Sequence, residues 1–338
     1  MAERYVGIDL HRRRSVIHAM DADGKEISTV RIFNEPERLV SAVAAAVDGR
    51  DAEVVVEACY GWYWAVDLLQ AEGHRVRLSH PSGNNWGHRR VKNDERDARD
   101  LADLCRLGRL AEAWIAPPEI RQLRELVRYR HRLSQLRAGL KAQVHAVMAK
   151  EGVLPAASNL FGTIGGRRQL EELVVADAFL IRLESLLDLI EVYDRQIAML
   201  DANIAERLRD HSGYRAIQQL NGIGPVLAAI LVAEIGDIGR FRSAEALCSW
   251  AGLTPLHRES DTTVHRGPIT KMGSPLVRWA VQEGIARHKG DTKLRADFAR
   301  IAERRGKHKA RIAVARKLLT LVFYGLRDGE IRALATTG

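Results

Sequence analysis

A chain of 338 residues with 46% hydrophobic and 28% charged residues is long enough for two or three domains and too apolar to be disordered. No run of about 18 apolar residues occurs, and the N-terminus lacks an apolar signal core, which argues against a membrane-spanning or secreted protein. The net charge of +9 favours a polyanionic partner, and three scattered cysteines without metal-site spacing are typical of a reduced, cytoplasmic protein.

The first hundred residues alternate between strand and helix patterns. Short apolar runs predict strands, and apolar residues spaced three and four apart predict helices. Strands are expected at residues 4–10, 15–20, 25–33, 52–57 and 75–78, and helices at 36–47, 62–72 and 94–107. This β-β-β-α-β-α-β-α order is the element order of the ribonuclease H fold. Residues 1–117 therefore predict an α/β domain with a ribonuclease H-like fold.

Beyond Pro117-Pro118 the pattern changes to long helices. Apolar residues recur every seven positions in two segments, which is typical of helices packed along a common seam. The repeats are Leu126, Leu133, Leu140 and Val147, then Leu183, Ile190, Ile197 and Ile204. Residues 118–210 therefore predict an antiparallel helical hairpin or a dimerising coiled coil.

An arginine stripe lies on the first of these long helices and is interpreted as a nucleic-acid contact, with a solvated face as the alternative. The stripe consists of Arg121, Arg124, Arg128 and Arg132.

From residue 211 to 338 a third, mostly helical domain is expected. Its segment Gly222-Ile223-Gly224-Pro225 predicts a helix-hairpin-helix turn that either presents backbone N–H groups to a phosphate or is a simple tight turn.

Four carboxylates stand where the predicted sheet and a helix would meet. Asp9 and Glu57 end apolar strands that lie side by side in the ribonuclease H arrangement, and Asp94 and Asp97 share one face of a helix. Each alone has an ordinary explanation as a turn or helix cap. Together they would repel one another without a cation. The set therefore predicts a site for Mg²⁺ or Mn²⁺, with two ions about 4 Å apart, of the kind that acts on phosphodiesters.

Several short blocks, in order along the chain, carry a family resemblance. The first group is Gly7-Ile8-Asp9, Glu57 with Gly61-Trp62-Tyr63-Trp64, and Lys92-Asn93-Asp94-Glu95-Arg96-Asp97-Ala98. The second group is Gly222-Ile223-Gly224-Pro225, Phe241-Arg242-Ser243, Ala251-Gly252-Leu253-Thr254-Pro255 and Ile269-Thr270-Lys271-Met272-Gly273. Joined by a helical hairpin, these blocks resemble the RuvC-like and transposase domains of the DEDD transposases of the insertion-sequence 110 group, relatives of the pilin-gene invertases.

The resemblance implies that Asp9, Glu57, Asp94 and Asp97 are a metal-binding tetrad, and that a serine nucleophile follows the Gly-Leu-Thr-Pro block. Ser260 is the best match, although its two neighbours depart from the paired serines and glycine that are common in the family. Members of the family use an element-encoded bridge RNA that pairs with donor and target DNA. The expected partners are therefore DNA, such an RNA, and further copies of the chain in a dimer or tetramer.

The sequence thus predicts an insertion-element recombinase. Ser260 would attack a phosphodiester and form a phosphoserine, while the tetrad holds the metal. One alternative is a RuvC-like junction resolvase that uses metal-activated water and needs only the tetrad. Another is a nucleic-acid-binding protein without catalysis, whose DNA binding would survive the loss of all four acids.

Overall fold

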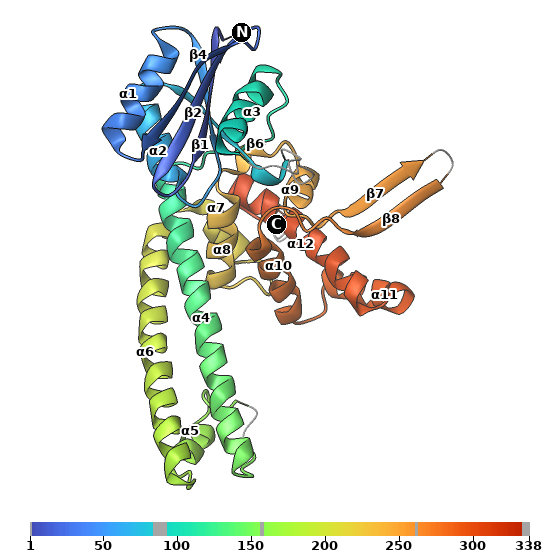
Figure 1. The fold of residues 1–338 in the computed structure, drawn as a ribbon. Helices are drawn as coiled ribbons and strands as arrows, with labels where there is room; N and C mark the ends of the chain where they lie inside the picture. Colours follow the sequence, from blue (N-terminus) through green and yellow to red (C-terminus); the bar gives the residue numbers. More distant parts are fainter. Residues whose placement is uncertain (1, 84–92, 156–158, 261–262, 333–338) are drawn as a thin grey trace. The chain divides into compact units, whose positions relative to one another are not determined.

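The computed structural model describes residues 2–83, 93–155, 159–260 and 263–332 of the chain (Figure 1). The chain divides into two compact units, Met1–Ala116 and Pro117–Gly338. The finer division into three domains, at residues 117 and 210, stays a prediction. No helix within the described ranges is long and apolar enough to cross a membrane.

The first unit contains a mixed six-stranded sheet. Its strands are β1 Arg4–Leu10, β2 Arg14–Asp21, β3 Glu26–Phe33, β4 Ala52–Glu57, β5 Arg75–Ser79 and β6 Glu112–Ala113. They lie in the order β3-β2-β1-β4-β5-β6, with β1 antiparallel to β2 and parallel to β4. The predicted order of elements is confirmed, and this mixed sheet fits a ribonuclease H-like fold. The short strand β6 is an addition to the predicted set.

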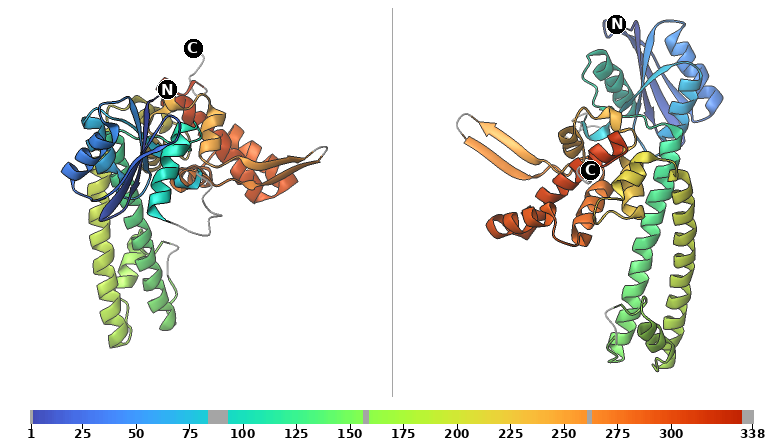
Figure 2. Two further views of the ribbon diagram at one scale, coloured as in Figure 1. Left: turned by 45° about the horizontal axis from the view of Figure 1, so that its top comes forward. Right: turned by 180° about the vertical axis from the view of Figure 1, so that it is seen from behind.

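Helices cover both faces of this sheet, as Figures 1 and 2 show. Helices α1 (Pro36–Val47) and α2 (Trp62–Ala71) pack on one face, against alternate strand residues such as Ile8 and Val56. Helix α3 (Asp94–Arg106) packs on the other face, where Leu101 contributes to a core with Val55. Successive residues of a strand point to opposite faces. Asp9 and Glu57, with odd numbers like Val55, therefore lie on the α3 face.

Gly7 permits an unusually close approach between β1 and α3. A Cβ atom at this position would lie 2.0 Å from the Ala98 carbonyl oxygen and 2.8 Å from the Ala102 nitrogen. Both neighbours are backbone atoms of α3, so no side-chain rotation could make room. A glycine in a strand interior often marks such a close approach of another backbone. Gly7 therefore determines how near the first turn of α3 comes to the end of β1.

The second unit is mostly helical. Its elements are α4 Pro118–Lys150, α5 Ile164–Glu171, α6 Asp177–Leu208, α7 Ser212–Ile217, α8 Pro225–Ile235, the 3₁₀ turn η3 Ile238–Arg240, α9 Ala244–Trp250, β7 Pro255–Ser260, β8 Thr263–Ile269, α10 Pro275–Arg287, α11 Lys293–Arg305 and α12 Lys307–Asp328. Helix α8 is apolar except for Glu234, and nine of its eleven residues are buried. A helix with that composition belongs in a core, and α8 forms the centre of this one with α7, α9, α10 and α12.

The long helices α4 and α6 run antiparallel, side by side in both views (Figures 1 and 2). Val147 near the end of α4 packs with Leu183 near the start of α6, and Leu133 packs with Ile197 further along. The seam is made by the residues of the two seven-residue repeats, six of which are buried: Leu133, Val147, Leu183, Ile190, Ile197 and Ile204. The helical hairpin is therefore present, and its assignment as a coiled coil stays a prediction.

Three of the four arginines of the α4 stripe are buried or bonded to α8, and the nucleic-acid contact predicted for the stripe stays a prediction. Arg121 is buried. Arg124 donates to the carbonyl oxygens of Ala233 and Glu234 at 2.8 and 2.9 Å, and so caps the C-terminal end of α8. Arg128 makes a bidentate ion pair with Glu234, at 2.6 and 3.0 Å. These cations compensate the last carbonyls and the one buried acid of α8.

The Gly222 turn between α7 and α8 lies against α10. A Cβ atom at Gly222 would lie 2.1 Å from the Gly284 carbonyl oxygen, and the turn has a φ of +88° at this glycine. The Asn221 side chain also bonds the Lys289 backbone in both directions, at 2.6 and 3.0 Å. Packing within the unit thus accounts for this glycine, which favours the simple-turn interpretation over phosphate binding.

Candidate functional site

The predicted acidic residues of the first unit converge on the α3 face of the sheet. Asp9 is the next-to-last residue of β1, and Glu57 is the last residue of β4. In the parallel ladder Ile8 pairs with Val56, so Asp9 and Glu57 come next at neighbouring strand ends. Burial raises the pKa of the nearby Cys59 thiol, and the charges of Glu57 and Asp9 raise it further. Both carboxylates therefore act on the same small region.

Helix α3 brings the other two acids to this region. Asn93 caps the helix, and its side chain accepts a hydrogen bond from the Glu95 backbone nitrogen at 3.1 Å. The cap is therefore Asn93, and the alternative in which Asp94 serves as the cap is wrong. Asp94 is left in the first turn, where it is half-exposed, and Asp97 one turn later is buried.

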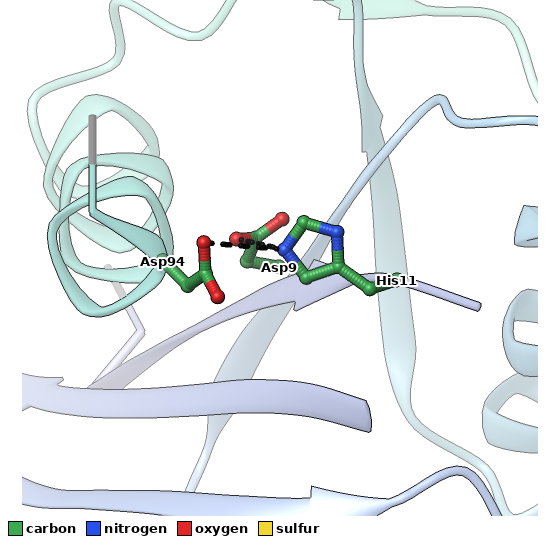
Figure 3. A group of neighbouring side chains, drawn as sticks. All are labelled: Asp9, His11 and Asp94. Atoms are coloured by element: carbon green, nitrogen blue, oxygen red, sulfur yellow. Dashed lines mark hydrogen bonds and ion pairs between the residues drawn. The ribbon is translucent and has the colours of Figure 1, made fainter. Parts of the chain in front are cut away.

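The closest cluster within the described residues contains Asp9, Asp94 and a histidine that the sequence analysis did not single out, His11 (Figure 3). The His11 Nε2 atom lies 3.0 Å from Asp9 Oδ2 and 3.4 Å from Asp94 Oδ1. One ligand atom from each of the three residues falls within 4.8 Å of the other two. Among the described residues, Glu57 and Asp97 do not belong to this closest group, although they lie on the same face.

The electrostatics of the cluster are unfavourable for bare carboxylates. Burial raises the pKa of Asp9, the charge of His11 opposes that rise, and repulsion from Asp94 and then Asp97 adds to it. The net direction is upward, so the ionised form of Asp9 is destabilised where it stands. A bound cation would reverse this effect, because it attracts all three carboxylates.

The donor set fits a divalent cation. Carboxylate oxygens suit Mg²⁺ and Mn²⁺, and an imidazole nitrogen is also an accepted ligand of transition ions. Asp9 lies on a rigid strand and Asp94 on a capped helix, so two of the donors are held by regular structure. Sequence reasoning overlooked His11. The only signal in the sequence was its position, directly after β1 and two residues beyond Asp9.

Ser260 belongs to the second unit, where it is the last residue of strand β7. Its Cα partner across the hairpin is Thr263, at the start of β8. Asp261 and Thr262 lie outside the described residues, and so does the side chain of Ser260. The β7–β8 hairpin extends away from the helices of its own unit (Figure 1). Ser260 and Thr263 form the last pair of its ladder, so Ser260 lies near the tip.

The base of this hairpin is firmly attached to the helical body. Arg278 of α10 donates to three carbonyl oxygens there, those of Ala251, Met272 and Gly273, at 3.1, 2.6 and 3.2 Å. Gly252 and Gly273 both have positive φ, and Cβ atoms there would lie within 2.3 Å of backbone carbonyl oxygens. The hairpin therefore starts from a tightly packed platform.

A second set of contacts fixes the start of α10 beside that platform. The Ser274 hydroxyl caps α10 and donates to Glu234 Oε2 at 2.9 Å. Burial by itself would raise the pKa of Glu234, but hydrogen bonds from Arg128 and Ser274 and the charge of Arg124 hold that pKa below its usual value. Glu234 is therefore an ionised, buried anchor between α4, α8 and α10.

Family models match both units of the chain. A family model described as "Transposase", of the IS110 DEDD type, matches residues 6–151, and one described as "Transposase IS116/IS110/IS902 family" matches residues 214–289. The transposase for insertion sequence element IS1111A of Coxiella burnetii is 24% identical over 337 residues, covering 95% of this chain and 88% of that protein. An insertion element IS116 protein of Streptomyces clavuligerus is 27% identical over 319 residues, covering 76% and 77% of the two chains.

A third relative is named for the inversion of a gene. The pilin gene-inverting protein of Moraxella lacunata is 30% identical over 155 residues, covering 42% of this chain and 47% of that protein. The first model spans the sheet and the acidic cluster, and the second spans the α8 core and the β7–β8 hairpin. With both domains present in the expected order, the chain belongs to the IS110/IS116/IS902 family of transposases, enzymes that act on DNA.

Proposed function

We propose that this transposase cleaves and rejoins DNA strands with a composite site, in which Asp9, Glu57, Asp94 and Asp97 hold Mg²⁺ or Mn²⁺ and Ser260 is the nucleophile. The observation that carries the metal half is the convergence of these acids on one face of the sheet, with Asp9 buried and its pKa raised. Carboxylates arranged in this way repel one another when all are ionised, and a bound cation removes that repulsion.

The protein's own residues would perform distinct tasks in the reaction. The Ser260 oxygen forms a bond to phosphorus, the bond from phosphorus to the departing deoxyribose oxygen breaks, and the hydroxyl proton passes to that oxygen. The four carboxylates would hold the divalent cation beside the phosphodiester. The cation would supply Lewis-acid stabilisation of the negative charge on the phosphoryl oxygens and on the leaving oxygen. Rejoining reverses these bond changes with a new strand end.

Support for the serine half comes from the hairpin that carries it. Ser260 stands near the tip of a two-stranded element whose base is fixed by Arg278 and by two tightly packed glycines. Loops and tips on a rigid scaffold are favoured places for catalytic groups. The tetrad could act on DNA with the serine of its own chain or with that of another copy in a dimer or tetramer.

The partners we propose are the element ends, a target DNA and a guide RNA of the bridge type. A net charge of +9 suits nucleic acid, which the protein must hold through many phosphate contacts. Guidance by RNA rests on the resemblance to the insertion-sequence 110 group. Pull-down of RNA from cells that carry the whole element, followed by sequencing, tests this part directly.

Two substitutions test the composite site. Ser260→Ala should abolish strand transfer and the covalent protein–DNA adduct on a denaturing gel, and Asp97→Asn should abolish cleavage at any Mg²⁺ concentration. Ser249→Ala, an exposed serine of α9, and Asp103→Asn, on the same helix as Asp97, are matched controls that should keep activity. Both catalytic variants should still bind DNA.

Other outcomes would favour the alternatives. Full cleavage by Ser260→Ala, together with an inactive Asp97→Asn, would support a resolvase that uses metal-activated water. DNA binding without cleavage by the wild-type protein, with either metal and with the element's RNA present, would support a binding protein.

A further inference from the structure

We propose that His11 Nε2 is a direct ligand of the divalent cation and makes the site prefer Mn²⁺ to Mg²⁺. This inference rests on the metal-dependent function proposed above. The four acids alone would supply only oxygen ligands, and His11 would add a nitrogen ligand.

The first support is distance. In an octahedral ion with bonds of about 2.1 Å, two neighbouring ligand atoms lie about 3.0 Å apart. The Nε2 atom of His11 lies 3.0 Å from Asp9 Oδ2, with which it forms a hydrogen bond, and 3.4 Å from Asp94 Oδ1, so each of these two separations is close to that of neighbouring ligand atoms. Figure 3 shows the imidazole edge turned toward both carboxylates.

The second support is that the backbone of His11 is held in place. Its N–H donates to the Arg14 carbonyl oxygen at 3.2 Å, and its carbonyl oxygen accepts a hydrogen bond from Asn34 Nδ2. The Asn34 oxygen in turn accepts from the buried Ser15 hydroxyl at 2.6 Å. Asn34 follows β3, so the end of a neighbouring hairpin fixes the residue that faces Asp9. Ligands supported in this way are pre-organised for a metal.

The third support is accessibility. The side chain of His11 is 47% exposed, and that of Asp94 is 52% exposed, while Asp9 is 7% exposed. A cation can therefore reach the cluster from solvent, and a phosphate oxygen can reach a coordination position that the protein leaves open. A buried, fully enclosed cluster would not permit either step.

Nitrogen donation changes which ion the site selects. Imidazole is a ligand of transition ions, whereas Mg²⁺ strongly favours oxygen and retains its waters. Mn²⁺ accepts carboxylates as readily as Mg²⁺ does but also binds imidazole well. A cluster of two aspartates and one histidine should therefore bind Mn²⁺ more tightly than Mg²⁺. Removal of the imidazole should bring the affinities for the two ions closer together.

Spectroscopy of the full-length protein tests the ligand directly. With one equivalent of Mn²⁺, electron spin echo envelope modulation of the wild-type protein should show coupling to a directly bound nitrogen, and His11→Ala should lose it. His74→Ala removes a partly exposed imidazole of the same unit and should keep the coupling. His11→Gln, which replaces the nitrogen ligand by an amide oxygen, should bind Mn²⁺ without nitrogen coupling.

Calorimetry measures the preference. Loss of the imidazole should weaken Mn²⁺ binding about tenfold or more and change Mg²⁺ binding much less. Circular dichroism confirms that each variant is folded. Tight Mn²⁺ binding by the wild-type protein without nitrogen coupling would overturn the ligand role of His11 and leave the proposed function standing. Absence of binding of either ion to the wild-type protein would overturn the metal-dependent function itself.

Discussion

Substitution of Gly7 by alanine should displace α3 and disable the acidic cluster without touching any carboxylate. The added Cβ would lie 2.0 Å from the Ala98 carbonyl oxygen, whereas ordinary contact begins at 3.4 Å. The neighbours are backbone atoms, so relief requires the whole helix to move away from β1. A shift of about 1.4 Å closes the difference between those two distances.

The expected magnitudes follow from that shift. Overpacking of a core costs about 1–3 kcal/mol, and the upper end applies where backbone must move. Displacement of a catalytic group by about 1 Å can lower activity roughly 100-fold. Asp94 and Asp97 travel with α3, while Asp9 stays on β1. We therefore expect Gly7→Ala to lose about 3 kcal/mol of unfolding free energy and about 100-fold in DNA cleavage.

Two measurements check this prediction. Chemical denaturation followed by circular dichroism gives the unfolding free energy, and cleavage of a substrate with the element ends gives the activity. Gly139→Ala is the matched control: Gly139 lies exposed in the middle of α4 with nothing within 4 Å of an added Cβ, so this variant should be slightly stabilised and fully active. If Gly7→Ala retained wild-type stability and cleavage, the close approach of β1 and α3 would not position the site.

Three further predictions concern other contacts. Asn34→Ala removes one of the two hydrogen bonds described for the His11 backbone and should weaken Mn²⁺ binding about tenfold by calorimetry. Glu234→Gln removes the buried charge that holds Arg128 and should lower the unfolding free energy by about 2 kcal/mol at pH 7. The folded pKa of Glu234 lies below its ordinary value of 4.5. Its stabilising contribution is therefore present above pH 4.5 and is lost as the pH falls through the folded pKa. The wild-type protein should lose more unfolding free energy on acidification than Glu234→Gln does. Arg278→Met removes three hydrogen bonds at the base of the hairpin and should speed amide hydrogen exchange at residues 252–254 and 270–274.

Each of these has a result that would contradict it. Unchanged Mn²⁺ affinity in Asn34→Ala would mean that the loop of His11 does not need this hydrogen bond. Equal acid sensitivity of wild type and Glu234→Gln would remove Glu234 as a source of the pH dependence. Wild-type exchange rates in Arg278→Met would show that the glycine contacts alone hold the hairpin base.

The sequence alone was sufficient for the features that depend on local pattern. Strand and helix periods predicted the order of elements in the first unit, and the seven-residue repeats predicted the seam between α4 and α6. The acidic residues were visible because a charge at the end of an apolar strand departs from the usual pattern. The family blocks then pointed to a transposase, which the comparisons confirm.

Only the tertiary structure could decide what each charged residue faces. A helix period places Arg124 and Arg128 on one stripe, but it does not say whether that stripe meets water or the C-terminal end of α8, 109 and 106 residues away in sequence. Likewise His11 becomes part of the cluster only because Gly7 lets α3 approach β1 and Asn34 holds the intervening loop. Contacts of this kind join residues far apart in the chain. They arise from packing, which no local periodicity records.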